Sequence, residues 1–298
     1  MHGWIILDKP LGLGSTQGVS AVKRALRDGK YGKFKVGHGG TLDPLATGVL
    51  PIALGEATKL AGRMLDSDKV YDFTLDFGVQ TDTLDAEGAP AATSDVRPPL
   101  GAVEAVLSRF TGPIDQVPPA YSALKVDGER AYDLARAGEA VVLASRAVTI
   151  HALSIQGVEG GDGALESVTL RAHVSKGTYI RSLARDIALA VGTVGHVTML
   201  RRIKAGPFGL DSAISLDILA DAGKGRTLEH YLLPLRAGLD DIPALPLDPD
   251  QAGLLRRGQV LAGTHADDGQ YLALLGETPI ALVEAQAGFV RVVRGFNL

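Results

Sequence analysis

The sequence predicts an α+β fold: a mixed, mainly antiparallel sheet with packed helices, followed by a small C-terminal β-barrel. Its 298 residues suit a large domain with a smaller one. Strand and helix patterns are interspersed without the regular strand–helix repeat of a parallel doubly wound sheet. A proline-rich segment at 242–249 then precedes a tail of short apolar runs. We therefore expect one domain over residues 1–242 and a second over 246–298.

The first elements follow from short-range patterns. The apolar run 4–7 predicts a strand. Ser15 or Thr16 is a suitable N-cap for the helix that follows, and Gly29 is a natural stop for it. Nearly strict alternation over 70–77 predicts a half-buried strand.

The later elements are predicted in the same way. Apolar residues at helical spacing predict helices over 103–110 and 180–191, and alternation predicts a strand over 168–174. Three prolines within 243–249 prevent a continuous helix or central strand there. The tail then carries four short apolar runs, which predict the strands of the barrel. These runs are 260–261, 271–275, 280–283 and 289–293.

Composition excludes several classes of protein. The absence of cysteine excludes disulfides, a thiol nucleophile and thiolate metal sites. There is no basic leader and no apolar stretch long enough to cross a bilayer, so we expect a cytoplasmic protein without a membrane partner. The net charge of -4, taken alone, argues mildly against a nucleic-acid partner.

The positive charge is concentrated locally. Residues 21–40 hold six basic residues against one acid, Asp28, as expected of a chain that meets a polyanion along one strip. A solvated helix face would give the same pattern. The six residues of this basic strip are Lys23, Arg24, Arg27, Lys30, Lys33 and Lys35.

Three familiar motifs are incomplete. The glycine-rich run 12–18 lacks the P-loop lysine and the dinucleotide spacing. Residues 38–40 resemble an esterase oxyanion loop, but the chain has no Gly-x-Ser-x-Gly elbow. The acids within 66–87 do not follow the EF-hand pattern. Nucleotide binding, esterase chemistry and EF-hand calcium binding are therefore disfavoured.

The segment 37–51 is the strongest candidate for a site. Three glycines in four residues allow unusual dihedrals and a close approach of a bulky ligand. Asp43 is the one ionisable acid in this predicted loop, and Pro44 fixes the chain just after it. An ordinary turn in which Asp43 bonds its own backbone would look the same.

The sequence of this segment resembles the signature of the TruB family of tRNA pseudouridine-55 synthases. Further blocks of that family recur in order along the predicted large domain. They are Asp8–Pro10, Leu54–Lys59, Leu65–Tyr71, Gln80–Asp85, Pro118–Lys125, Ser175–Arg181 and Leu200–Arg202. The tail past Pro246 resembles the family's small RNA-binding PUA-like barrel more loosely.

The resemblance implies a pseudouridine synthase fold and an isomerase. Such enzymes act on uridine 55 in the T-arm loop of tRNA: the base is flipped out, uracil is detached, its ring turns, and it is rejoined through C5. No group is lost and no hydride moves, so we expect no cofactor and no metal. The partner is then the T-arm stem-loop rather than DNA, and we expect a monomer.

The resemblance also assigns catalytic residues. Asp43 matches the essential aspartate, which serves as nucleophile, and Arg181 matches its arginine partner. A neighbouring cation favours the ionised carboxylate. Arg181 and Arg185 lie one helical turn apart, so an anion between them would relieve their repulsion. Tyr71 matches the tyrosine that packs on the target base and assists proton transfer, although its strand face also suits a core tyrosine.

Five further residues are predicted to contact the substrate or organise its site. His38 matches the position that enters the RNA loop and replaces the flipped nucleotide, although a lone histidine is commonly structural. Tyr179 and Leu200 match the lining of the uracil pocket. Asp85 is expected to organise the cleft, and Lys9 is a candidate phosphate contact.

Three alternatives stay open from the sequence. One is a non-catalytic RNA-binding module or a tRNA-folding chaperone. Another is a glycosidase-like hydrolase, which would need a second acid near Asp43. The third is the group of related guide-dependent archaeal and eukaryotic enzymes. Within the isomerase hypothesis, Asp43 attacks C1′ or C6, or the reaction uses a glycal intermediate with Tyr71 as base.

Overall fold

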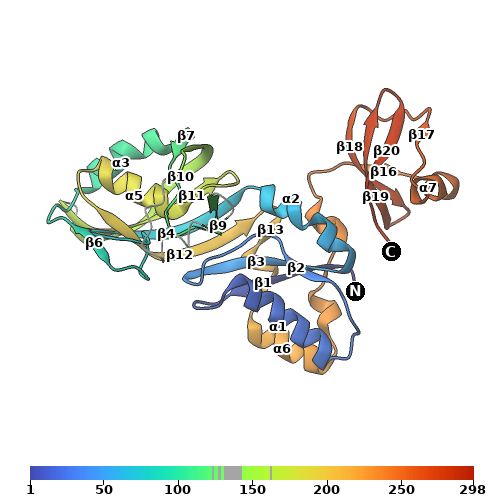
Figure 1. The fold of residues 1–298 in the computed structure, drawn as a ribbon, viewed down its shortest axis with the longest axis horizontal. Coiled ribbons are helices and arrows are strands. Elements are labelled where there is room, and N and C mark those ends of the chain that lie inside the picture. The colour runs from blue at the N-terminus through green and yellow to red at the C-terminus, as the bar shows by residue number, and fades with distance from the viewer. Residues whose placement is uncertain (123, 127–128, 131–142, 162) are drawn as a thin grey trace.

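A large mixed sheet organises the chain (Figure 1). The computed structural model describes residues 1–122, 124–126, 129–130, 143–161 and 163–298. The main path of the sheet runs β14-β1-β3-β12-β4-β11-β10-β7. Three further strands pair with members of this path: β2 with β3, β13 with β12 and β15 with β1. Among these strands, β1 with β14 and β3 with β12 are parallel, and the other pairs are antiparallel. The predicted mixed, mainly antiparallel α+β fold is therefore confirmed. The strands are β1 (Gly3–Lys9), β2 (Val36–His38), β3 (Ala46–Leu54), β4 (Lys69–Phe77), β7 (Gly112–Gln116), β10 (Arg146–Gly161), β11 (Ala164–Val174), β12 (Gly195–Ala205), β13 (Phe208–Gly209), β14 (Ala213–Ile214) and β15 (Leu233–Pro234).

Helices cover the two halves of this sheet and create two buried clusters. One cluster joins β4 and β11 to α3 and α5, and the other joins β1 and β3 to α1 and α6 (Figure 1). Tyr71 and Leu200 pack against both clusters. These two partly buried side chains therefore lie where the two halves of the sheet meet. The helices are α1 (Ser15–Asp28), α2 (Ala61–Asp66), α3 (Leu100–Leu107), α5 (Ile180–Ala190), α6 (Leu216–Gly225) and α7 (Pro249–Arg256).

The periodic segments fold as predicted. The expected strands at 4–7, 70–77 and 168–174 are β1, β4 and β11, and the helix at 180–191 is α5. The helix expected over 103–110 is α3 followed by a 3₁₀ turn. Gly29 follows α1 as predicted.

Two local predictions were wrong. The N-cap of α1 is Gly14, because the hydroxyl of Ser15 points to Leu42 instead of capping the helix. The segment 37–51 is also not one loop, since β2 and β3 occupy most of it and leave only 39–45 between them. β3 is buried along almost its whole length, so it lacks the alternation that marks a half-buried strand.

The C-terminal part forms a separate five-stranded sheet in the order β16-β18-β19-β20-β17. Within the described residues β16 and β17 do not pair, so the sheet stays open and the predicted closed barrel is not confirmed. Its core is covered by α7. The strands are β16 (Ala244–Pro246), β17 (Leu261–Ala262), β18 (Gly269–Leu275), β19 (Thr278–Gln286) and β20 (Phe289–Gly295). Four short strands, β5 (Val79–Thr81) with β6 (Pro90–Thr93), and β8 (Lys125–Val126) with β9 (Glu129–Arg130), make two antiparallel pairs outside both sheets.

The smaller sheet is packed onto the larger part of the chain. Leu272, Leu282 and Phe296 share one buried cluster with Trp4 and Phe208. β16 also begins two residues before the expected boundary at 246. The division into 1–242 and 246–298 stays a prediction, and this shared cluster means that deleting the tail would expose core side chains. No helix in the described part of the chain is long and apolar enough to cross a membrane.

Candidate active site

Asp43 lies in the short connection between β2 and β3, anchored from both sides. The hydroxyl of Ser15 accepts from the Leu42 amide at 2.8 Å and donates to the Leu42 carbonyl at 3.0 Å. The Ala46 amide donates to the Asp43 carbonyl at 3.0 Å. The Asp43 side chain itself is 46% exposed. The backbone is thus held while the carboxylate faces outward.

Lys9 supports the same segment from below. Its side chain is buried, and its ammonium donates to the carbonyls of Leu13 at 2.6 Å, Pro10 at 3.1 Å and Pro44 at 3.2 Å. Burial lowers the pKa of Lys9 to about 8. A buried ammonium with three carbonyl partners does not reach a phosphate in this structure. The expected phosphate contact is therefore corrected to a supporting role.

Replacing Lys9 with methionine is expected to destabilise the fold by about 1–3 kcal/mol, since three carbonyls lose their donor inside the protein. Urea unfolding at neutral pH measures this. Lys23→Met, at an exposed position on α1, is the matched control and should stay within about 0.5 kcal/mol of wild type. Equal stability of the two variants would contradict the supporting role.

The lowered pKa of the buried Lys9 also predicts that the free energy of unfolding depends on pH. Its folded-state pKa is about 8, against 10.5 for the free side chain. Between these values the unfolded chain binds more protons than the folded chain, so the free energy of unfolding gains a term that rises with pH. The stability of wild type relative to Lys9→Met should therefore increase from pH 8 to pH 10.5. A relative stability that falls across this window would show that burial does not disfavour the charged form.

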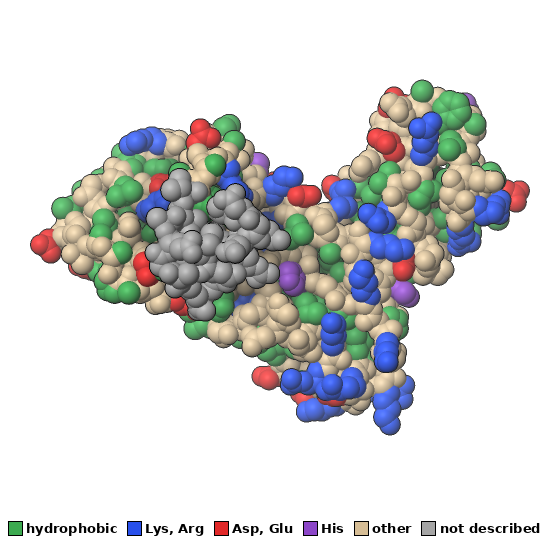
Figure 2. All heavy atoms as spheres, viewed as in Figure 1, with side chains coloured by type: hydrophobic (Ala, Val, Ile, Leu, Met, Phe, Trp, Pro, Cys, Tyr) green, Lys and Arg blue, Asp and Glu red, His purple; other side chains and the backbone are tan. Residues whose placement is uncertain are grey.

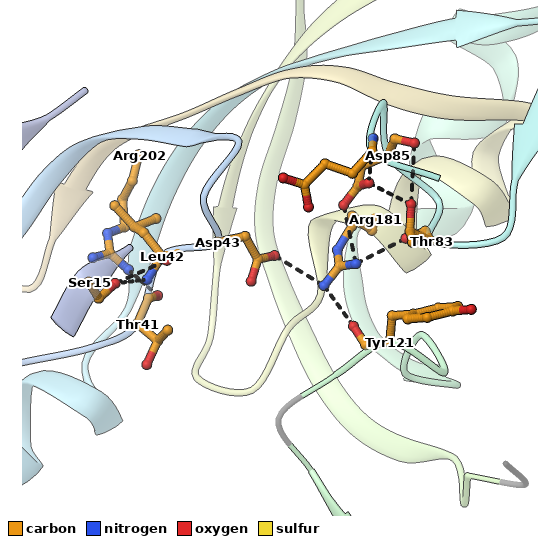
Figure 3. A network of polar contacts seen from close by, with 10 residues as sticks. Ser15, Thr41, Leu42, Asp43, Thr83, Asp85, Tyr121, Arg181 and Arg202 are labelled. Atoms are coloured by element: carbon orange, nitrogen blue, oxygen red, sulfur yellow. Dashed lines mark hydrogen bonds and ion pairs between the residues drawn. The ribbon is translucent and has the colours of Figure 1, made fainter. Parts of the chain in front are cut away.

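Arg181, in the first turn of α5, connects two carboxylates (Figure 3). Its Nη2 lies 3.1 Å from Oδ2 of Asp43, and its Nη1 lies 3.2 Å from Oδ2 of Asp85. Nη1 also donates to the Thr83 carbonyl and Nη2 to the Tyr121 carbonyl, each at 3.0 Å. The guanidinium side chain is 9% exposed. Four acceptors thus fix its plane and aim one edge at Asp43.

Asp85 is the buried partner of this arginine. Its carboxylate, 10% exposed, accepts from the Thr83 hydroxyl at 2.6 Å and from the Glu87 amide at 3.1 Å. These bonds hold the carboxylate in place beside the guanidinium. Asp85 therefore neutralises and orients Arg181, an arrangement that fits its expected organising role.

The exposed edge of this network opens into a cavity of about 330 Å³. Five predicted site residues line it. They are Asp43, Tyr71, Tyr179, Arg181 and Leu200. β12 pairs with β4 so that Arg202 lies opposite Tyr71, and Leu200 lies opposite Phe73. The Tyr179 amide donates to Oε1 of Gln116 at 2.8 Å, at the start of α5. A carboxylate, a guanidinium and two phenol rings therefore meet in one cavity.

Comparison with known proteins decides the family. The model of the TruB family pseudouridylate synthase N-terminal domain matches residues 27–180. The model of the tRNA pseudouridylate synthase B C-terminal domain matches residues 181–240. The chain belongs to the TruB family. It is therefore a pseudouridine synthase, an isomerase.

Curated relatives agree over the full chain. The tRNA pseudouridine synthase B of Novosphingobium aromaticivorans is 69% identical and covers 100% of this chain and 98% of its own. That of Zymomonas mobilis is 58% identical, over 100% of this chain and 96% of its own.

Solved structures share the fold. A chain in "Structure of H/ACA RNP bound to a substrate RNA containing 2'-deoxyuridine" matches with a TM-score of 0.74 at 25% identity, over 99% of this chain and 85% of its own. A chain in "Crystal Structure of a Cbf5-Nop10-Gar1 Complex" matches with a TM-score of 0.74 at 26% identity, with the same two coverages. The pseudouridine synthase fold expected for this TruB family member is thus confirmed.

His38 lies apart from the residues that line this TruB cavity. It sits in β2 opposite Ile52, and its Nδ1 is buried without a hydrogen-bond partner among the described residues. Burial, followed by the charge of Arg202, lowers the pKa of His38 and so favours its neutral ring. Its expected contact with the RNA loop stays a prediction.

The cavity lining also includes residues that were not predicted as site residues. Among them, Lys69, Ser122 and Arg202 lie within blocks of the family resemblance. Burial lowers the pKa of Lys69 to about 8. Arg202 is 1% exposed and donates to the carbonyls of Val49 at 2.8 Å and Thr41 at 3.2 Å. The strand pattern could have identified Lys69 as a lining residue, because it lies two residues before Tyr71 and therefore on the same face of the strand. No such pattern marked Ser122.

Arg185 does not share an anion with Arg181. Its Nε pairs with Asp186 at 2.8 Å, and its Nη2 donates to the Val117 carbonyl at 3.2 Å. The argument that both arginines flank one anion was therefore wrong, because the side chain of Arg185 turns to its sequence neighbour. Of the two arginines, it is Arg181 that contacts Asp43.

Proposed function

We propose that this TruB family enzyme converts uridine 55 in the T-arm loop of tRNA to pseudouridine, with Asp43 as the nucleophile. The observation that carries the proposal is the Asp43 carboxylate, half exposed in a cavity and 3.1 Å from the buried Arg181 guanidinium. A carboxylate nucleophile must be ionised, and an adjacent fixed cation favours that form. The curated relatives named tRNA pseudouridine synthase B support tRNA as the substrate.

The reaction starts with extrusion of the uridine, which costs a few kcal/mol of stacking and pairing. In the cavity the base stacks against Tyr71, while Tyr179 and Leu200 bound the uracil. Arg181 holds Asp43 toward the nucleotide. In this scheme Asp85 does not contact the nucleotide, and its role is to keep the Arg181 guanidinium in place.

The chemical step exchanges two bonds at the sugar. The bond from C1′ to N1 breaks, the ring turns, and C1′ joins C5, whose proton is released while N1 gains one. Asp43 forms an adduct at C1′ or C6, and Tyr71 assists the proton transfer from C5. In a glycal route Tyr71 would be the base instead. Both routes need the same pair, Asp43 and Tyr71, in one cavity.

The hydrolase alternative needs a second acid that is free to exchange protons near Asp43. Asp85 is the acid that shares Arg181 with Asp43, but its carboxylate is bonded to Arg181, Thr83 and Glu87. This arrangement favours a positioning role. The complete set of Asp43, Tyr71 and Arg181 likewise favours an enzyme over a non-catalytic RNA-binding module.

The guide-dependent alternative is disfavoured by degree of similarity. Chains from the H/ACA RNP and the Cbf5-Nop10-Gar1 complex match at 25% and 26% identity, whereas curated relatives named tRNA pseudouridine synthase B reach 69% and 58%. We propose a cytoplasmic monomer that binds the T-arm stem-loop directly. In this proposal the open C-terminal sheet is a PUA-like RNA-binding module.

Position specificity is tested with a full-length unmodified tRNA transcript and nucleoside mapping by mass spectrometry. One pseudouridine at position 55 is expected, and a transcript with cytidine at that position should remain unmodified. A product at another position in both transcripts would contradict the proposed site.

The exposed basic strip on and after α1 is the proposed contact with RNA phosphates. All six of its residues are exposed, and Figure 2 shows Lys and Arg side chains gathered over the region of α1. Other basic residues are already paired: Arg171 with Asp72, and Arg201 with Asp8. Within the strip Arg27 pairs with Asp28 at 3.6 Å, and the strip still concentrates the exposed positive charge that RNA binding requires.

Arg24→Gln is expected to weaken tRNA binding and to lower the slope of log affinity against log salt by about 1. Fluorescence anisotropy at several KCl concentrations measures the slope. Arg109→Gln, an exposed arginine next to α3, is the control and should leave the slope unchanged. Identical slopes for wild type and Arg24→Gln would remove Arg24 from the interface.

A further inference from the structure

We propose that Asp68, His151 and His173 form a binding site for one divalent transition-metal ion, of which Zn²⁺ is the representative. The three side chains lie outside the catalytic cavity and come from three separate segments. Asp68 immediately precedes β4, His151 is in β10 and His173 is in β11. Nothing in the proposed isomerisation uses them.

The three donor groups converge on one point. Nε2 of His151 lies 3.2 Å from Oδ2 of Asp68, and Nε2 of His173 lies 3.7 Å from the same oxygen. All three ligand atoms lie within 4.8 Å of one another. Zinc bonds of about 2.0–2.2 Å in tetrahedral geometry separate neighbouring donors by about 3.4 Å. The two measured separations bracket this value, so one ion fits with small side-chain adjustments.

A β-bulge brings the two histidines together. In the pairing of β10 with β11, Ile150 lies opposite Val174 and Ala152 opposite His173, so His151 is the extra residue. An extra residue redirects the side chain of a strand, and bulges are concentrated near functional sites. The His151 and His173 rings are 4.7 Å apart as a result. The bulge therefore brings the two imidazole rings together as well as changing the shape of the strand.

The charge environment favours a cation here. Two basic side chains of the neighbouring segments are paired elsewhere, Lys176 with Asp66 and Arg171 with Asp72, whereas the charge of Asp68 acts on the adjacent Lys69 and Lys204 lines the same hollow. Among the described residues, the ion-pair partners of the Asp68 carboxylate are the two histidines. A metal ion bound by the two imidazoles would add its positive charge beside this carboxylate.

The donor set selects the class of ion and leaves it accessible. Two imidazoles and one carboxylate suit Zn²⁺ and its first-row neighbours, whereas Mg²⁺ and Ca²⁺ prefer all-oxygen sites. The side chains are 37–49% exposed, which leaves room for a water ligand. An adjoining hollow of about 690 Å³, lined in part by Asp68 and His173, gives a path for entry.

A bound ion would link three segments near the active site. It would tie β10 and β11 to the residue before β4, and β4 begins with Lys69 and carries Tyr71. The expected role is structural. Binding should stabilise the folded chain by mass action without entering the reaction.

The test uses the full-length chain without a histidine tag. Isothermal titration with Zn²⁺ should show one ion per chain, and Co²⁺ should give the visible absorption of a four- or five-coordinate site. Because removing even an outer-shell partner of a metal site weakens binding by about 10–100-fold, His151→Ala and His173→Ala should each weaken it at least about 100-fold. His265→Ala, at an exposed histidine in the C-terminal part, should bind like wild type.

A second variant guards against misfolding. Asp68→Asn keeps the side-chain size, and its melting temperature should not rise with Zn²⁺, whereas that of wild type should. No binding by wild type, or equal binding by wild type, His151→Ala and Asp68→Asn, would overturn the proposal. Chelation that abolishes isomerisation would contradict the structural role.

Discussion

Asp43→Asn is expected to lower the rate of pseudouridine formation by at least about 10⁴-fold, as for removal of a catalytic nucleophile. The amide keeps the shape of the side chain but has no negative charge with which to form an adduct. Asp43 is 46% exposed, so the variant should fold normally. Single-turnover formation of pseudouridine in a T-arm stem-loop measures the effect.

A measurement of RNA binding distinguishes a loss of chemistry from a loss of RNA recognition in this variant. Asp43→Asn should bind the stem-loop with wild-type affinity, because phosphate contacts supply most of the binding energy. Asp95→Asn, at an exposed acid away from the cavity, is the matched control and should retain full activity. A near-normal rate for Asp43→Asn would exclude Asp43 as the nucleophile.

Arg181→Met is expected to lose both activity and stability. It leaves the buried Asp85 carboxylate without a cation, and breaking a buried ion pair in this way costs about 3–5 kcal/mol. It also removes the cation beside Asp43. Urea unfolding and single-turnover kinetics measure the two effects.

A double variant distinguishes the two roles of Arg181. In Arg181→Met/Asp85→Asn the uncompensated charge is gone, so much of the stability should return while the activity stays low. Arg185→Met, one turn along α5, is the control, since its pair with Asp186 lies near the surface and should contribute within about 1 kcal/mol. Recovery of activity in the double variant would show that Arg181 acts on folding alone.

The sequence predicted the elements whose side chains alternate between core and solvent. β4, β11 and α5 each have one buried face, so their periodicity is visible in one chain. β3 is buried along almost its whole length and hides this signal. β12 is interrupted by two register shifts and carries the buried Arg202, which together obscure its pattern.

Five of the site residues assigned by the family resemblance line one cavity, while their roles stay predictions and depend on packing. Lys9 looked like a phosphate ligand because lysines are usually exposed, yet three backbone carbonyls hold it inside. Arg185 turned to its sequence neighbour. The Asp68, His151 and His173 cluster depends on a β-bulge, and no spacing in the sequence reveals which residue is the extra one.

Tritium release from a T-arm stem-loop labelled at C5 of uridine 55 measures the central step directly, because the new bond to C1′ replaces the C5 hydrogen. Wild type should release the label to water, while Asp43→Asn should bind the same RNA and release almost none. No release by wild type would contradict the isomerisation of uridine 55. Release by Asp43→Asn at a near-normal rate would contradict the role of Asp43.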